Sequence, residues 1–329
     1  MKRFSVILIG IYILFLPLPF EAMAHHGGIS LSHGPGSPIE TNSPFTLPEG
    51  GFLSLYRVEH VDFRKFDFAE PVNKDSFTFH SLGLAYGIRP YLTGNFFLPY
   101  TIKRQDTLGS IEGVGDIRFC ANLGFNYDPA YGLRLNKRED TAITLEGKRK
   151  VYLSLLGSFT LPTGNSNERL GSQIDRGMQP GFRSPLYSMG ASAAKQVASS
   201  MTFVADTSYD IFTKSDNFKF GNEYRLNVAI VYEIYGSTQR MISKVDGVFE
   251  FNFLNLGRDE EEGKGLPATG GTILYLSPGL RISLPALWNA NMGFLLKFPT
   301  IKNLNEEDIQ QGSEGLEKIR GIATISLYF

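Results

Sequence analysis

The chain has few of the residues on which catalytic and metal-binding domains depend. It carries one cysteine, one tryptophan and five histidines in 329 residues. A single cysteine, Cys120, excludes an intramolecular disulfide and a thiolate metal cluster. The formal net charge is only −1, so no basic domain could neutralise nucleic-acid phosphates, and we expect no nucleic-acid partner. The sequence contains neither a nucleotide-binding motif nor a G-x-S-x-G motif, so we predict neither enzymatic activity nor a cofactor.

Long apolar runs are also scarce. Only the run from Phe4 to Phe20 approaches the ~20 residues of a spanning helix, and it follows Lys2 and Arg3 and precedes the A-x-A site Ala22-Met23-Ala24. We interpret residues 1–24 as a signal peptide. Two prolines interrupt the run, which makes an uncleaved anchor the weaker alternative. Export without a helical span leaves the periplasm or the outer membrane as the destination.

Aromatic residues and glycine are abundant instead. The chain has 26 Phe, 15 Tyr and 35 Gly, yet its mean hydropathy is only −0.10. A chain that is rich in aromatics but not hydrophobic on average is typical of a transmembrane β-barrel, which has one face towards lipid and one towards water. The composition therefore favours the outer membrane of a Gram-negative bacterium.

Alternation of apolar and polar residues between turn residues predicts about twelve β-strands. Several reach the ~9–11 residues that a tilted strand needs to cross a bilayer. We therefore predict an all-β, closed, antiparallel transmembrane barrel over residues 52–329, with both termini in the periplasm. The predicted strands cover 52–62, 76–88, 90–103, 113–127, 148–162, 182–196, 200–213, 219–235, 241–254, 271–284, 287–301 and 317–329.

The links between these strands alternate between short and long, as the periplasmic turns and outer loops of such barrels do. Short links fall at 89–90 and 285–286, for example, and long ones at 63–75 and 163–181. The link 128–147 breaks the alternation, because it is long and charged where a short turn is expected. It is either a periplasmic insertion or the sign of a miscounted strand.

The two faces of each predicted strand differ in character. In the strand 241–254, Phe249 and Phe251 lie on one face and Asp246 and Glu250 on the other. Because a cation at the bilayer midplane costs about 2–4 kcal/mol on the lipid side, the charged face must line the lumen. Mixed signs suggest ion pairs that narrow the path, although the same side chains could simply solvate a wet interior. The charged residues predicted to line the lumen are Arg57, Glu59, Asp116, Arg118, Asp206, Asp210, Arg225, Glu233, Asp246, Glu250, Arg281, Lys297 and Arg320.

The final predicted strand ends on an aromatic residue. Ile325, Leu327 and Phe329 share its apolar face. This pattern resembles the C-terminal signal that the barrel-assembly machinery reads in Gram-negative outer-membrane barrels, so we expect that machinery and outer-membrane lipid as partners. The alternative is an ordinary edge strand of a soluble domain.

The segment 25–51, between the signal peptide and the first predicted strand, contains His25, His26 and His33. Imidazole suits Cu(II), Ni(II) and Zn(II), and cleavage after Ala24 would let the amine and ring of His25 chelate together. The alternative is a flexible leader in which glycine and proline set turns. The leader is also long enough to enter and occlude the lumen.

Two further groups raise chemical alternatives. His60 and His80 are the histidines outside the leader, and a lipid-facing Ser/His/acid group would make the barrel a lipid hydrolase. The acidic run Glu260-Glu261-Glu262 follows a predicted strand and could hold Ca²⁺ through its carboxylates. Acidic runs on outer loops are more often simply solvated.

Several motifs together resemble a known family. They are the run from Gly34 to Thr41, the run from Leu47 to Phe52, Gly113-Val114-Gly115-Asp116 and Leu161-Pro162-Thr163-Gly164-Asn165. These are similar to the outer-membrane proteins catalogued under MetA-pathway phenol degradation, or as transporters. The resemblance implies an outer-membrane barrel that moves small, often hydrophobic or aromatic, compounds. The resemblance assigns no catalytic or binding residue in this chain.

The sequence thus predicts a passive, porin-like outer-membrane channel for small solutes, in which the leader and the link 163–181 are candidate gates. The alternative is a non-conducting binding or structural barrel, associated with metal through its N-terminal histidines. The identity of the permeant, the pore radius and the oligomeric state are left open.

Overall fold

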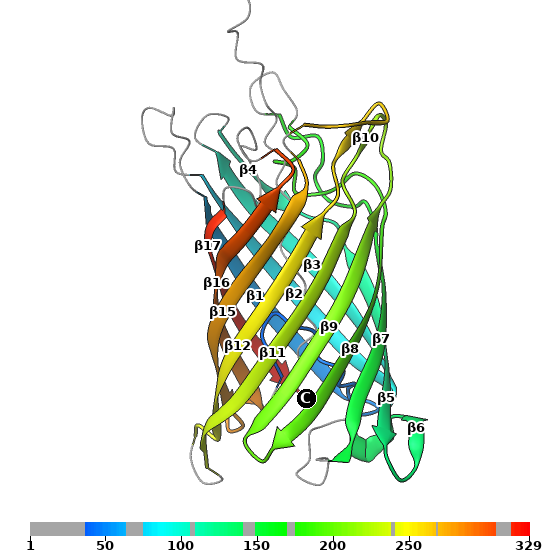
Figure 1. The fold of residues 1–329 in the computed structure, drawn as a ribbon, viewed down its shortest axis with the longest axis vertical. Helices are drawn as coiled ribbons and strands as arrows, with labels where there is room; N and C mark the ends of the chain where they lie inside the picture. Colours follow the sequence, from blue (N-terminus) through cyan, green and yellow to red (C-terminus); the bar gives the residue numbers. More distant parts are fainter. Residues whose placement is uncertain are drawn as a thin grey trace, which may run out of the picture.

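A computed structural model describes residues 37–63, 75–105, 109–140, 149–169, 175–237, 241–267, 269–306 and 317–329. These residues form a closed antiparallel β-barrel of twelve strands that tilt around its axis (Figure 1). The predicted fold class is confirmed. Within the described ranges, no helix is long and apolar enough to span a membrane.

Each predicted strand corresponds to a barrel strand, with shifts of a few residues at the ends. The elements are β1 (Phe52–Phe63), β2 (Ser76–Arg89), β3 (Leu92–Gln105), β4 (Gly109–Val114), β5 (Arg118–Asp128), β6 (Gly132–Leu135), the 3-10 helix η1 (Arg138–Asp140), β7 (Val151–Thr160), β8 (Leu186–Ala198), β9 (Met201–Phe212), β10 (Phe218–Lys219), β11 (Glu223–Gly236), β12 (Lys244–Leu256), β13 (Glu260–Glu261), β14 (Lys264–Gly265), β15 (Gly271–Leu284), β16 (Ala290–Leu304) and β17 (Glu317–Tyr328).

The pairing of the first strand with the last closes the barrel, and the wall continues across the short β4. β1 pairs with β17, with Ser54 opposite Leu327, and β3 pairs with β5, with Phe97 opposite Arg118. Every other barrel strand pairs with its neighbours along the chain. Closure gives the backbone amides and carbonyls partners without an exposed sheet edge, which a lipid environment requires.

The range 113–127, predicted as one strand, is interrupted. β4 and β5 both pair with β3, but residues 115–117 between them do not. Pro99 of β3 lies at the break and has no amide proton for a ladder bond, while its carbonyl accepts a hydrogen bond from the amide of Gly115 (2.9 Å). The proline and the close approach of Gly115 to it divide the predicted strand into two.

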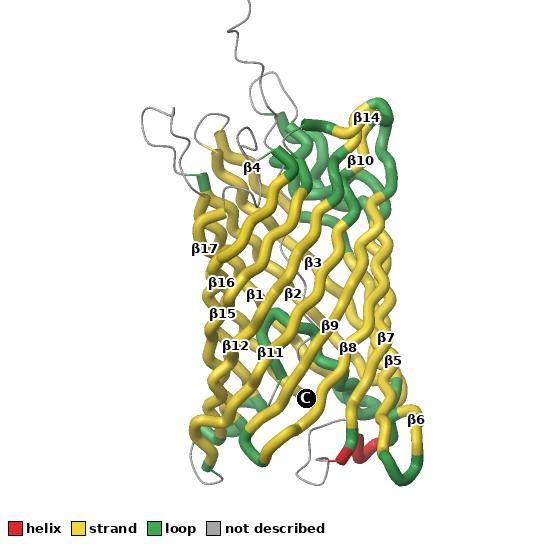
Figure 2. Tube along the Cα trace, viewed as in Figure 1, coloured by secondary structure: helices red, strands yellow, loops and turns green. Residues whose placement is uncertain are grey.

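The charged link after β5 is an insertion and not a miscounted strand. β5 pairs directly with β7, with Cys120 opposite Ser158. β6 folds back onto the other edge of β5, with Tyr127 opposite Leu133, where β3 has not yet begun. η1 follows β6, and residues 141–148 lie outside the described part of the chain. The insertion lies at the same end of the barrel as the turn between β8 and β9 (Figure 2).

At the opposite end, β10, β13 and β14 form a small separate sheet (Figure 1). Residue 219, predicted to begin a barrel strand, therefore belongs to this sheet. The reason lies in the loop: the carboxylate of Asp259 accepts a hydrogen bond from the amide of Gly221 (2.7 Å), which turns the chain before β11 begins.

The outer surface is apolar and aromatic. Tyr187, Tyr209 and Tyr224 are exposed near the end of the barrel where β8 begins, β9 ends and β11 begins. Tyr131 and Trp288 are exposed at the other end, by 66% and 73%. Aromatic side chains at two levels, with apolar residues between them, form the outer surface expected of a barrel that spans a membrane.

Candidate functional site in the barrel lumen

The chain before β1 lies inside the barrel. Residues 37–51 form the blue coil enclosed by the strands in Figure 1, and Ile39, Thr41 and Phe45 are 1%, 0% and 3% exposed. We call residues 37–47 the inner segment. Its prolines, Pro38 and Pro44, lack amide protons and fix φ, so the segment does not add to the wall as a strand. Its backbone groups instead bind inward-facing side chains.

The carboxylate of Glu250, on β12, is the main anchor of the inner segment. Its Oε1 accepts hydrogen bonds from the amides of Ile39 (2.8 Å) and Glu40 (2.9 Å). Its Oε2 accepts bonds from the amide (2.7 Å) and the hydroxyl (2.5 Å) of Thr41. Bonds to an ionised acceptor are about twice as strong as neutral ones. Glu250 is fully buried, so the inner segment supplies donors that water would otherwise have to provide.

Glu40 extends the contact as an ion pair with the opposite side of the wall. Its carboxylate lies 2.5 Å from Arg57 on β1 and 3.0 Å from Lys297 on β16. Burial alone would raise the pKa of Glu40, but the charges of Lys297 and Arg57 outweigh it and hold the pKa well below its usual range. The inner segment is therefore anchored as an anion between two cations.

Arg57 and Glu40 belong to a longer chain of buried charges. Arg57 also pairs with Glu59 (2.8 Å), Glu59 pairs with Arg320, and Arg320 pairs with Glu317 (2.6 Å). Each acid in this chain contacts a cation, so the network is neutralised locally. Removing one member would leave an uncompensated buried charge.

Further polar contacts fix the beginning and the middle of the inner segment. A guanidinium nitrogen of Arg281 donates to the carbonyls of Ser37 (2.8 Å) and Pro38 (3.2 Å). The amide and the side-chain nitrogen of Asn42 donate to the two carboxylate oxygens of Asp206 (2.9 and 3.1 Å). Both wall residues are buried. The segment is therefore bound along its length by residues of strands on several sides of the lumen.

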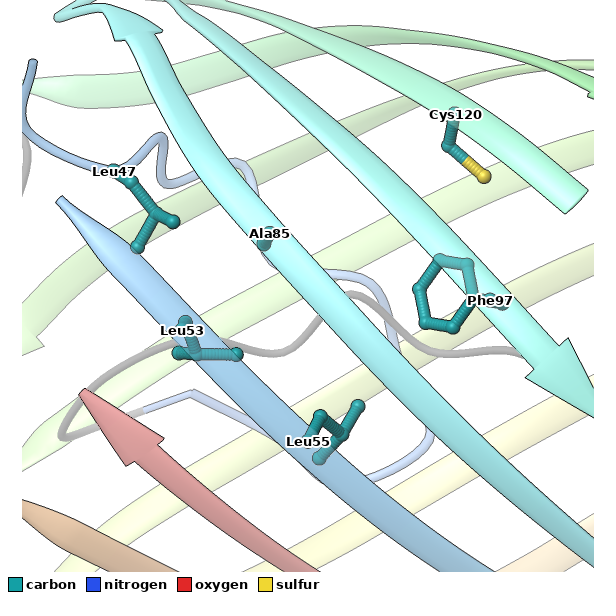
Figure 3. Close-up of a cluster of buried hydrophobic side chains, with 6 residues drawn as sticks. All are labelled: Leu47, Leu53, Leu55, Ala85, Phe97 and Cys120. Atoms are coloured by element: carbon teal, nitrogen blue, oxygen red, sulfur yellow. The ribbon is translucent and has the colours of Figure 1, made fainter. Parts of the chain in front are cut away.

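Apolar contacts complete the fit. Leu47 packs against the buried side chains shown in Figure 3, which come from β1, β2, β3 and β5. The rings of Phe45 and Tyr152 lie 5.0 Å apart, and Ile39 packs against Val231, Val248, Leu295 and Ile322. Burial of an aliphatic or aromatic side chain contributes about 1.5–3 kcal/mol, so these three residues add to the polar anchoring.

A second segment, residues 161–184, closes against the wall at the other end. Asp116 accepts hydrogen bonds from the amides of Gly164 (2.7 Å) and Phe182 (2.6 Å), and burial raises its pKa. A Cβ on Gly164 would lie 2.6 Å from the backbone of Gly115, so this close approach requires glycine. The predicted gate 163–181 is thus in contact with the wall, and its residues 170–174 lie outside the described ranges.

Lys103, on β3, holds the same segment. Its ammonium group donates to the carbonyls of Gly177 (2.7 Å) and Gln179 (2.9 Å) and is fully buried. Met178, between these residues, is also fully buried, against Phe77 and Phe79. Lys103 is not among the residues predicted to line the lumen, although its inward position in β3 could have identified it.

The structure places the predicted lumen residues on the inner face of the wall. Arg57, Glu59, Lys297 and Arg320 come together in the network around Glu40. Arg225 pairs with Glu223, and Glu233 pairs with Lys244 at a strand end. Those that are buried are Arg57, Glu59, Asp116, Asp206, Asp210, Asp246, Glu250, Arg281, Lys297 and Arg320, whereas Arg118, Arg225 and Glu233 are half-buried.

Sequence reasoning missed Glu40 and Glu317. Glu40 precedes the first strand, where alternation gives no information about direction. Glu317 is three residues from Arg320, so simple alternation places it on the lipid face. The register between β1 and β17 shifts at Asp62 and Phe63, and this irregularity turns Glu317 inward.

The residues of the enzymatic alternative do not form a hydrolytic group. His80 and His60 face outward, where Nδ1 of His80 lies 2.8 Å from the hydroxyl of Tyr56 and Nδ1 of His60 lies 2.8 Å from that of Thr78. Ser81, next to His80 in sequence, alternates onto the inner face with Phe79. A serine and a histidine on opposite faces of a strand cannot act together.

The positions of the three histidines predicted as metal ligands are not described. His25, His26 and His33 lie outside the described residues. In the part of the chain that the structure describes, no group of three or more His, Cys, Asp or Glu side chains is arranged to hold a metal ion. Glu260, of the acidic run considered for Ca²⁺, lies 3.9 Å from the ammonium of Lys219.

Comparisons with known proteins support the fold. No protein-family model matches the chain, and no curated protein matches it. Among solved structures, it is similar to an outer-membrane channel from Pseudomonas putida F1, with a TM-score of 0.62, 14% identity, and coverage of 87% of this chain and 98% of that one. The P. putida toluene transporter TodX matches with a TM-score of 0.43 and 7% identity over 93% and 99% of the two chains. The NanC porin matches with a TM-score of 0.40 and 10% identity, over 84% of this chain and 98% of that one. The chain therefore has the fold of an outer-membrane β-barrel.

Proposed function

We propose that the protein is a passive outer-membrane channel for small solutes, held closed at its inner end by residues 37–47. The observation that carries the proposal is the anchoring of this segment inside the barrel by Glu250, Arg57, Lys297, Arg281 and Asp206. A barrel of about twelve strands is wider than the ~8-stranded barrels that side chains alone can fill. An additional segment is therefore needed to close it.

In this proposal both termini lie in the periplasm and the barrel is inserted by the barrel-assembly machinery, which reads the terminal pattern of Ile325, Leu327 and Phe329. The solute moves down its gradient. The inner segment, which is joined directly to β1, can leave the lumen towards the periplasm without disturbing the wall.

The class of solute is inferred from the family resemblance and from the apolar groups of the lumen. Phe212, Phe218 and Phe220 form a buried aromatic cluster with Leu186, at the end of the barrel where β8 begins and β9 ends. Val61, Phe77, Phe79 and Met178 form a second one. Small hydrophobic or aromatic compounds would find partners in both clusters before they reach the inner segment.

Deletion of residues 26–45 tests the closing role. Planar-bilayer recordings are expected to show a larger conductance for the shortened protein, and liposome swelling with solutes graded by size and polarity should show a higher size limit. An unchanged conductance would remove the inner segment from the mechanism. Glu112→Gln, on the outer face of β4, serves as the control for altered charge.

The filled lumen also favours a second candidate, a non-conducting binding barrel associated with metal through His25, His26 and His33. In that case the deletion would give no conductance. Calorimetric titration of the intact protein with Cu(II) and Zn(II) would show stoichiometric heat, which a channel without a metal function should not show.

A further inference from the structure

Among the described inward-facing cations, Arg118 has neither a carboxylate partner nor the backbone-carbonyl partners that Arg281 and Lys103 have. In the described ranges, Arg57, Arg225, Lys297 and Arg320 each pair with a carboxylate. Arg118 lies on the inner face of β5, in alternation with the buried Cys120. Its Nε donates a hydrogen bond to the hydroxyl of Thr160 (2.9 Å). No carboxylate of the described residues forms an ion pair with it.

The carboxylates close to Arg118 are engaged elsewhere. Asp116, two residues away, accepts the amides of Gly164 and Phe182. Asp210, on β9, is separated from Arg118 by the two strands β7 and β8. Arg118 therefore retains a permanent charge and the two terminal nitrogens of its guanidinium for a partner that enters the lumen.

The row of wall residues that contains Arg118 is mainly apolar. Strand register sets Phe97, Arg118, Thr160, Leu186 and Phe212 in one row across five strands. Phe97, Leu186 and Phe212 are buried on the inner face, and Arg118 is half-buried. One cation in an apolar row suits a ligand with one negative group and an apolar body.

The row also lies between the two closing segments. The residues of β5 and β3 two inward-facing positions further along the wall, Asn122 and Thr93, contact the inner segment through the carbonyl of Phe45 (3.5 Å) and the amide of Leu47 (2.8 Å). On the other side of the row, Asp116 binds the segment 161–184. Arg118 therefore lies on the wall between the two closing segments.

We propose that Arg118 forms a specificity site for small organic acids, in which its guanidinium binds the carboxylate of a permeant whose apolar body packs on the row of Phe97, Leu186 and Phe212. The site rests on the proposed channel function and gives it a substrate class, namely monocarboxylates with an aromatic or aliphatic body. A guanidinium fork and a carboxylate match in a bidentate geometry, and the weak screening of the lumen strengthens the pairing. A charged residue within a membrane-spanning segment that lacks a partner is a candidate for such a role.

The test is a calorimetric titration of the purified full-length protein in detergent with sodium benzoate and with benzamide, its neutral analogue, near neutral pH. We expect benzoate to bind about tenfold or more tightly than benzamide, because a bond to a charged partner is lost with the amide. Arg118→Gln should remove this preference, and Arg118→Lys should retain part of it. Arg104→Gln, which changes an exposed arginine on the outer face of β3, should leave both affinities unchanged.

Heat-modifiable migration on gels establishes that each variant is a folded barrel. Equal binding of benzoate and benzamide by the native protein, or an Arg118→Gln variant that retains the preference, would overturn the site. A different result would reject the channel function. That result is the absence of any current, with sodium benzoate or any other salt, after residues 26–45 are deleted. Benzoate binding without any current would therefore support the site and reject the channel.

Discussion

Replacing Glu250 by glutamine is expected to release the inner segment from the lumen. The carboxylate accepts three backbone amides and one hydroxyl from Ile39, Glu40 and Thr41. Glutamine is nearly isosteric, but one of its two terminal atoms is an NH₂ group that can only donate. The NH₂ group of the glutamine would therefore lie against backbone amides, which are also donors. Its remaining oxygen carries no charge.

The size of the effect follows from the contacts. Two of the bonds are lost, and each bond to a charged acceptor contributes about 1.5–3 kcal/mol. The other two become neutral bonds of about 0.5–1.5 kcal/mol. Because such contributions are not additive, we expect docking to weaken by about 3–5 kcal/mol, equivalent to a factor of about 100 to 5,000 in the equilibrium between docked and released segment.

The assay measures exposure of the inner segment. Ser43 is 1% exposed, so a Ser43→Cys side chain should react with a thiol reagent only from the released state. The buried Cys120 is replaced by serine in this background. We expect Glu250→Gln to raise the labelling rate about a hundredfold or more and to raise the frequency of open events in planar bilayers. Glu112→Gln, on the outer face of β4, is the matched control and should change neither.

An unchanged labelling rate in a Glu250→Gln barrel that is folded would refute this reasoning. It would show that apolar burial of Ile39, Phe45 and Leu47 holds the segment without help from the carboxylate. A higher labelling rate with unchanged current would show that the segment moves but does not close the path.

Three other changes probe the wall and the second segment. Arg320→Met should destabilise the barrel by about 3–5 kcal/mol in guanidinium unfolding, because it leaves buried acids without their cation; a loss below about 1 kcal/mol would contradict the network. The cationic partners of Glu40 lower its pKa from 4.5 despite burial, so its contribution is complete above that value and is lost as the pH falls through the lowered pKa. Current should therefore stay low from neutral to mildly acidic pH and rise only in stronger acid, and the variant Glu40→Gln should abolish this rise. Lys103→Met should speed amide exchange at Gly177 and Gln179 about tenfold or more, because both carbonyls lose a charged donor, and equal exchange would show that the lysine does not hold the segment.

The sequence by itself determined the wall of the barrel. A strand has a period of two residues, so the alternation that separates Phe249 and Phe251 from Asp246 and Glu250 is visible without any tertiary contact. The number of strands and their closed antiparallel arrangement followed from this local pattern and were confirmed. Where the local pattern is broken, it gives no such guide: the predicted strand 113–127 divides opposite Pro99, and alternation from Arg320 does not reveal that Glu317 is buried.

Only the tertiary structure decided what fills the barrel. The amide of Ile39 and the carboxylate of Glu250 are 211 residues apart, and Arg57 and Lys297 meet on Glu40 from strands at opposite ends of the chain. Irregular backbone has no period that could reveal its partners. The inner segment is therefore positioned by long-range charges and donors that come together only when the barrel closes.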